Sequence, residues 1–253
     1  MVKKSNNLNQ LLRNGDVWRA SRQAVHSISE KTVSGIATGY ASLDRLLQNH
    51  GWPQNGLTEI IQDQWGYGEI RLLLPALARL SESQNRWIAI INPPFTPYPP
   101  ALIQQHIHLE KILIINTINR QDALWSMEKT LTSGCCSAVL AWPEFIRTGQ
   151  VHMNSSHGRL LPDKSLRRLQ LASKTGHSLG VIFRPVAARV LFSPAELRLH
   201  IHSSRNPLSL EGETRVDILK RRGGWPTSLS LNLENSLRLL SGQPESDDKQ
   251  KNV

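Results

Sequence analysis

The segment 51–74 constrains the fold of this chain more than any other. Residues 57–61 are apolar and contain β-branched side chains, which is typical of a short buried strand. Gly66 and Gly68 then allow a tight loop, because glycine adopts backbone angles that other residues avoid. Leucines return at helical spacing over 69–80. The segment therefore predicts a strand, a glycine-containing loop and a helix, with a kink near residues 71–75 because of Pro75.

This order of elements is typical of a phosphate-binding loop, but the residues that bind phosphate are missing. A working loop reads G-x-x-x-x-G-K-[ST], in which the lysine contacts phosphate and the hydroxyl binds magnesium. Here Glu69 and Ile70 follow Gly68. We therefore predict no enzyme activity, no nucleotide cofactor and no metal. The degenerate loop comprises Gln62, Asp63, Gly66, Gly68, Glu69 and Ile70. An ATPase with an unusual loop is the less favoured alternative.

Strands and helices alternate through most of the remaining chain. We predict further strands at 87–91, 112–115, 138–142 and 179–183, and further helices at 101–106, 122–131 and 163–174. After Pro185 the pattern predicts strands alone, at 197–202, 215–220 and 228–233. The fold class expected is α/β, with a mostly parallel central sheet and antiparallel strands at the C-terminus.

Three regions differ in composition. Residues 1–34 are predicted to form a helical extension, 35–240 the core domain and 241–253 a disordered tail. The extension has no apolar signal-like run, which favours a cytoplasmic protein that does not span a membrane. The two cysteines, Cys135 and Cys136, are adjacent, so a reduced pair is expected rather than a disulfide framework.

The chain is strongly basic. Its 30 lysines and arginines exceed its 20 aspartates and glutamates, which gives a formal net charge of +10. The cluster Lys220, Arg221 and Arg222 either contacts phosphate groups of DNA or forms a solvated strand end. Other arginines could extend a basic surface: Arg167, Arg168, Arg184 and Arg189. The candidates for DNA or partner contact are Arg184, Lys220, Arg221 and Arg222.

Histidines and acids give weak signals. His106 and His108, and likewise His200 and His202, are two residues apart, but no third metal ligand is evident near either pair. Surface histidines are therefore expected. Glu144 follows a predicted strand and is expected to be a solvated loop acid.

Several motifs resemble known families. The sequences TGYASLD at 38–44 and GLTEI at 56–60 look like the entry to the core of RecA recombinases. A longer set resembles the RecA-like accessory proteins of bacterial translesion synthesis, the ImuA type. It comprises VWR at 17–19, GWP at 51–53, GEIRLLLPAL at 68–77, DALW at 122–125, AVLAW at 138–142, LRRLQLA at 166–172, FRP at 183–185 and VDILKRRGG at 216–224. The SulA-type inhibitors of cell division share the middle of this pattern, about 56–185.

The ImuA resemblance implies a RecA-like core and a non-catalytic accessory role in the DNA-damage response. Its implied partners are an inactive Y-family polymerase homologue and an error-prone replicative-type polymerase, with DNA, RecA and self-association as further candidates. A protein of this kind is expected in the cytoplasm and, when bound to DNA, at the nucleoid. The alternative hypothesis is a SulA-type inhibitor that blocks the division protein FtsZ.

Overall fold

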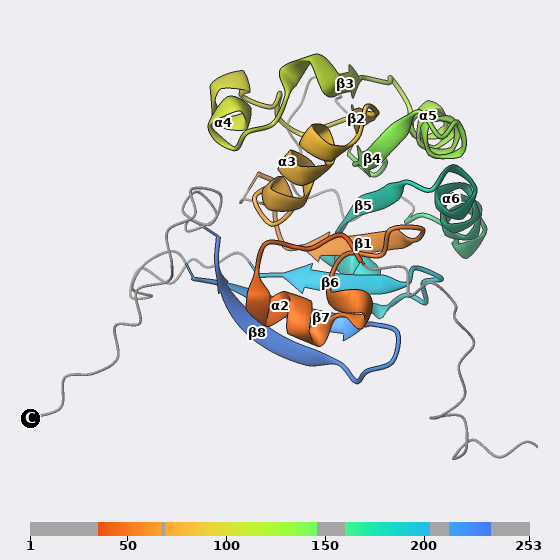
Figure 1. Ribbon diagram of the computed structural model, residues 1–253. Helices are drawn as coiled ribbons and strands as arrows, with labels where there is room; N and C mark the ends of the chain where they lie inside the picture. The colour runs from red at the N-terminus through yellow and green to blue at the C-terminus, as the bar shows by residue number, and fades with distance from the viewer. Residues whose placement is uncertain (1–34, 67–68, 146–159, 203–212, 234–253) are drawn as a thin grey trace, which may run out of the picture. The chain divides into compact units, whose positions relative to one another are not determined.

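The computed structural model describes residues 35–66, 69–145, 160–202 and 213–233 (Figure 1). The predicted N-terminal extension at 1–34 and the predicted tail at 241–253 lie outside these residues, as does Gly68 of the glycine-containing loop. No helix among the described residues has the length and apolar character needed to cross a membrane.

The described residues form an α/β fold around one eight-stranded sheet. The strand order is β3-β2-β4-β5-β1-β6-β7-β8. Pairing is parallel from β3 through β6 and antiparallel for β7 and β8. The prediction of a mostly parallel sheet with antiparallel C-terminal strands is confirmed. The strands are β1 (Leu57–Gln62), β2 (Trp87–Ile91), β3 (Ile112–Ile115), β4 (Cys136–Ala141), β5 (Leu179–Pro185), β6 (Leu197–Ile201), β7 (Glu213–Lys220) and β8 (Thr227–Asn232).

Helices cover both faces of the sheet, which explains why the central strands are apolar throughout. Every residue of β1 and of β4 is buried. One apolar cluster contains α3 (Leu74–Ser83) and the other contains α5 (Arg120–Thr132) and α6 (Asp163–Gly176), which lie together in Figure 1. The short helices α2 (Ala41–Leu46) and α4 (Pro99–Gln104) complete the described α-helices.

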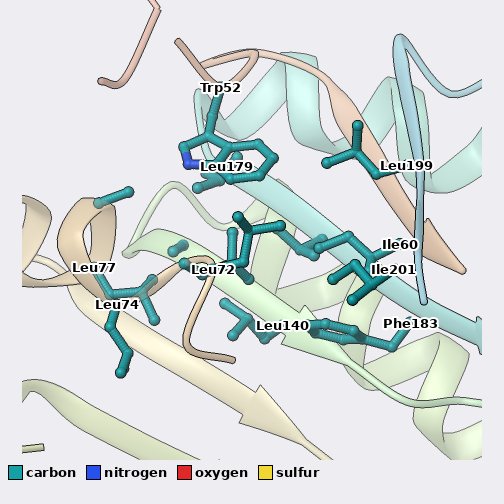
Figure 2. Packing of buried hydrophobic residues seen from close by; sticks show 14 of the residues in the cluster. Trp52, Ile60, Leu72, Leu74, Leu77, Leu140, Leu179, Phe183, Leu199 and Ile201 are labelled. Atoms are coloured by element: carbon teal, nitrogen blue, oxygen red, sulfur yellow. The ribbon is translucent and has the colours of Figure 1, made fainter. Parts of the chain in front are cut away.

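The larger cluster packs α3 against the sheet. Leu74 and Leu77 of α3 lie beside Leu140 of β4, and Phe183 of β5 lies beside the same group (Figure 2). Trp52, which precedes β1, is fully buried in this cluster. Burying large apolar side chains stabilises the fold by about 1.5–3 kcal/mol for each residue. This packing holds α3 against the central strands of the sheet.

The helix after the glycine-containing loop begins later than the sequence predicts. Residues 69–73 form turns, and α3 starts at Leu74 with Pro75 in its first turn. Proline is favoured there because the first amides of a helix need no partner within the helix. The predicted kink at Pro75 is therefore wrong, and so is the predicted helix start at Glu69. The other strands and helices predicted within the described residues are present, with ends that agree or differ by at most two residues.

Candidate functional site

The carboxyl ends of β1 and β6 meet at one edge of the sheet. The two strands are parallel neighbours, and Gln62 at the end of β1 pairs with Ile201 at the end of β6. Asp63 directly follows β1 and His202 directly follows β6, so both residues leave the sheet at the same edge. Ligands in open parallel sheets are usually bound beyond this edge.

The side chain of Glu69 accepts a hydrogen bond from the backbone of the loop after β1. The backbone N–H of Gly66 donates to both oxygens of Glu69, with distances of 3.0 and 3.1 Å. Glu69 is buried, with 4% of its surface exposed. In a phosphate loop, such amides would face the anionic phosphate. Glu69 therefore supplies a protein anion to a loop amide, in addition to replacing the expected lysine.

Gly66 is required at its position for two reasons. Its φ of +86° lies in the left-handed region, which favours glycine. A Cβ atom there would also lie 2.5 Å from Cε2 of Phe95, on the loop that follows β2. The loop after β1 is thus packed against the loop after β2. Gln62 is buried, whereas Ile70 is partly buried against the larger apolar cluster.

Asp63 belongs to a polar cluster that links three strands. Nε2 of His200 lies 2.9 Å from Oδ1 of Asp63, and Nδ1 of His202 lies 3.9 Å from Oδ2 of the same carboxylate. Nε2 of His202 lies 2.7 Å from Oδ2 of Asp217 on β7. The predicted surface position is wrong for His200, which is only 2% exposed. His106 and His108 are exposed, as predicted.

Asp217 is held in its ionised form. Burial alone would raise the pKa of Asp217, but hydrogen bonds with Ser228, His202 and Arg215 outweigh it and lower the pKa below its ordinary value. Arg215 donates from Nε to Oδ1 at 3.0 Å. The carboxylate therefore presents a fixed negative charge to the His202 ring.

A second polar cluster is largely buried, and its central pair, Arg184 and Glu59, has no exposed side-chain surface. Nη1 of Arg184 on β5 lies 2.7 Å from Oε1 of Glu59 on β1, and its Nη2 lies 3.0 Å from Oε1 of Glu144. Nε of Arg198 on β6 lies 2.5 Å from Oε2 of Glu59. Burial opposes the charge of Arg184, but Glu144 and Glu59 raise its pKa above the ordinary value.

This network corrects two sequence predictions. The Arg184 side chain has no exposed surface, so it is not available as a surface contact for DNA or a partner. Glu144 is not a solvated acid, because its side chain is 4% exposed and also accepts the backbone N–H of Leu161 at 2.8 Å. Sequence reasoning missed Glu59 and Arg198, although a charged residue inside an apolar strand signals a buried partner.

The basic segment at the end of β7 makes several contacts within its own fold. Nζ of Lys220 donates to the backbone oxygen of Ser193 at 2.9 Å. Burial and the nearby charge of Arg198 lower the pKa of Lys220. Arg221 donates to the backbone oxygens of Leu46 and Trp225. Arg222 is exposed. A contact role for this segment stays a prediction.

Exposed apolar side chains stand on the loops that follow β2 and β3. Phe95, Tyr98 and Ile118 are 62%, 68% and 90% exposed, and we call these three residues the apolar rim. Asn92 and Thr117 join these two loops. Nδ2 of Asn92 donates to Oγ1 of Thr117 at 2.8 Å, and the backbone N–H of Thr117 donates to Oδ1 of Asn92 at 2.7 Å. Exposed aromatic residues on a fixed support are typical of protein–protein contacts.

Comparison with known proteins gives a consistent family. The family model for the cell division inhibitor SulA matches residues 57–180. SulA from Yersinia pestis (strain Pestoides F) is 31% identical over 134 residues, which cover 53% of this chain and 70% of the relative. SulA from Yersinia pseudotuberculosis (serotype O:1b, strain IP 31758) gives the same values. The crystal structure of SulA from Pseudomonas aeruginosa is 22% identical, with a TM-score of 0.38, covering 51% of this chain and 97% of that one.

These matches overturn the first functional hypothesis. A translesion accessory of the ImuA type is not supported, and neither are the polymerase partners or the nucleoid association that it implied. The matched segment contains the glycine-containing loop, the apolar rim and α5. The hypothesis of a translesion accessory is therefore wrong, and the chain belongs to the SulA cell division inhibitor family.

Proposed function

We propose that this protein inhibits bacterial cell division during the SOS response by binding FtsZ. The observation that carries the proposal is the 31% identity to the cell division inhibitor SulA over 134 residues. That relative is an inhibitor by name, so the activity expected here is the blocking of a partner rather than the conversion of a substrate. Binding requires an exposed surface, and exposed apolar side chains within the matched segment support this proposal.

The proposed FtsZ contact is the apolar rim. All three of its residues lie within the matched segment 57–180. Phe95 and Tyr98 are aromatic. Aromatic side chains often contribute most to binding, because they bury a large area with little loss of conformational freedom. The hydrogen bonds between Asn92 and Thr117 hold the two loops together. A preorganised surface loses less entropy on binding than a flexible one.

We further propose that the chain is not an enzyme and that its core is a degenerate, RecA-like phosphate-loop fold. A glycine-containing loop follows the central strand β1 at the carboxyl edge, in agreement with that ancestry. The carboxylate of Glu69 on the Gly66 amide disfavours nucleotide binding, since it would repel phosphate at short range. Residues 69–73 also separate the loop from the start of α3, so the positive end of that helix is displaced along the chain.

Expression in growing bacteria tests the division-inhibitor proposal. We expect induction of the full chain in undamaged cells to give long filaments, because cells that cannot divide continue to elongate. The variant F95A/Y98A/I118A should restore cells of normal length. Its matched control is V190A/W225A, which also removes highly exposed apolar side chains but lies outside the matched segment.

The control variant should still give filaments at the same protein level. Circular dichroism of both purified variants would show whether they retain the wild-type fold. Filaments with the rim variant, together with normal cells for the control, would place the contact elsewhere. Normal division on expression of the wild-type chain would reject the proposed function.

A further inference from the structure

We propose that Asp63, His200 and His202 form a binding site for a divalent transition-metal ion, with Zn²⁺ as the best-matched ion. This inference is independent of the proposed contact with FtsZ. One ligand atom from each of the three residues lies within 4.8 Å of the other two. Two imidazole nitrogens and one carboxylate oxygen are ligands that suit zinc, whereas magnesium and calcium prefer oxygen alone.

The spacing of the donor atoms fits tetrahedral coordination. Zinc bonds of about 2.0–2.1 Å at tetrahedral angles place neighbouring donors about 3.3 Å apart. Oδ1 of Asp63 lies 2.9 Å from Nε2 of His200, and Oδ2 of the same carboxylate lies 3.9 Å from Nδ1 of His202, so these two donor separations lie on either side of that value. Shifts of about half an ångström in these side chains would bring both donor separations to the tetrahedral value.

The sheet orients the donors. His200 and His202 are two residues apart on an extended segment, so their side chains leave the same face, and their ring centroids are 4.1 Å apart. Parallel pairing of β1 with β6 brings Asp63 beside them across 137 residues of sequence. A site formed by neighbouring strands needs little reorganisation to bind an ion.

The environment of His202 resembles that of a metal ligand. Its Nε2 lies 2.7 Å from Oδ2 of Asp217, which favours the tautomer with hydrogen on Nε2 and leaves the lone pair of Nδ1 toward Asp63. A carboxylate that accepts this hydrogen bond fixes the ring and strengthens it as a ligand. Arg215 in turn holds Asp217 by a hydrogen bond of 3.0 Å.

The site is accessible to an ion. The side chains of Asp63 and His202 are 34% and 30% exposed, whereas that of His200 is 3% exposed. An ion can therefore enter from solvent and bind against a buried histidine. Three protein ligands leave the fourth tetrahedral position open for water or for a ligand atom of another molecule.

The surroundings also limit the expected affinity. Nδ1 of His200 is buried and has no hydrogen-bond partner among the described residues. Loss of such a supporting partner typically weakens metal binding by about 10- to 100-fold. We therefore expect a site that is weaker than a structural zinc site, with one ion bound for each chain.

The test uses the full chain without a histidine tag, freed of metal by a chelator. Titration with Co²⁺, whose visible absorption reports coordination, should saturate at one ion per chain, and Zn²⁺ should displace it. The variants D63N and H202N should lose this binding. The variant D217N should retain the same stoichiometry with an affinity about 10- to 100-fold lower, because it removes the carboxylate that orients His202 but none of the three proposed ligands.

The matched control is H106N/H108N, which removes an exposed pair with the same spacing. It should bind Co²⁺ like the wild-type chain. Circular dichroism of D63N and H202N would show whether each variant is folded, and either one folded without binding supports the site. Undiminished binding by folded D63N and H202N, or saturable binding that only H106N/H108N abolishes, would overturn the proposal. An absence of saturable binding by the wild-type chain would overturn it as well.

Discussion

Arg184 and Glu59 form an ion pair of 2.7 Å in which neither side chain has any exposed surface. The pair joins β5 to β1, and Glu144 and Arg198 extend it to the segment after β4 and to β6. Two arginines and two glutamates give the network no net charge. Such a network orders the strands around the sheet centre, because each buried charge depends on its partners.

Removing one member should strongly destabilise the fold. In the variant E59Q, Arg184 and Arg198 would lose a charged partner, and the free energy of unfolding should fall by about 3–5 kcal/mol. The matched control is E128Q, because Glu128 pairs with Arg168 at the surface, where such a pair contributes about 0–1 kcal/mol. Denaturant unfolding measures both values. Equal losses in the two variants would contradict this account.

The loop after β1 should depend on Glu69. In E69A the Gly66 amide would lose its charged acceptor, so we expect the free energy of unfolding to fall by about 1–3 kcal/mol. The control E82A removes an exposed glutamate from α3 and should change stability by less than about 0.5 kcal/mol. Urea unfolding compares the two. An unchanged E69A variant would mean that the carboxylate does not stabilise the loop.

Because Glu69 replaces the phosphate-binding lysine in this loop, we expect the purified chain to release no phosphate from ATP above a no-protein control. A charge of the wrong sign at about 4 Å, with an effective dielectric constant of about 20, disfavours phosphate by roughly 4 kcal/mol before screening. A phosphate-release assay checks this expectation. Turnover that co-purifies with the chain and disappears in R71A would indicate that Arg71 replaces the missing lysine.

The adjacent cysteines should react very differently. Burial, together with the neighbouring Cys135, raises the pKa of the Cys136 thiol from 9.0 to about 11, whereas Cys135 is exposed. Alkylation at neutral pH followed by mass spectrometry should therefore label Cys135 first and Cys136 only after unfolding. Because the folded pKa is raised, the stability from protonated Cys136 is complete below pH 9.0 and lost as the pH rises through about 11. Equal labelling rates would contradict this assignment.

The sequence predicted the sheet well because its signals are local. Residues 57–61 and 138–142 are apolar runs of strand length, and a strand covered on both faces needs that composition. The start of α3 was missed for a local reason too. Leucines over 69–80 keep helical spacing, but Pro75 fits best in the first turn of a helix, so residues 69–73 form turns instead.

The polar clusters could not be predicted because they depend on pairing between distant strands. Asp63 meets His200 only after β1 pairs with β6, and Arg184 meets Glu59 only after β1 pairs with β5. The sequence alone placed Arg184 and Glu144 at the surface by their charge. Burial reverses that expectation, because a buried charge is tolerated where an opposite charge is fixed beside it.

The most direct test of the proposed function is the assembly of purified FtsZ, followed by light scattering, in the presence of the purified chain. We predict that assembly falls in proportion to added protein and is suppressed near equimolar amounts, since a bound inhibitor removes subunits from the polymer. The variant V190A/W225A should act like the wild-type chain, and F95A/Y98A/I118A should have no effect. Full assembly of FtsZ in the presence of excess folded wild-type protein would contradict the account.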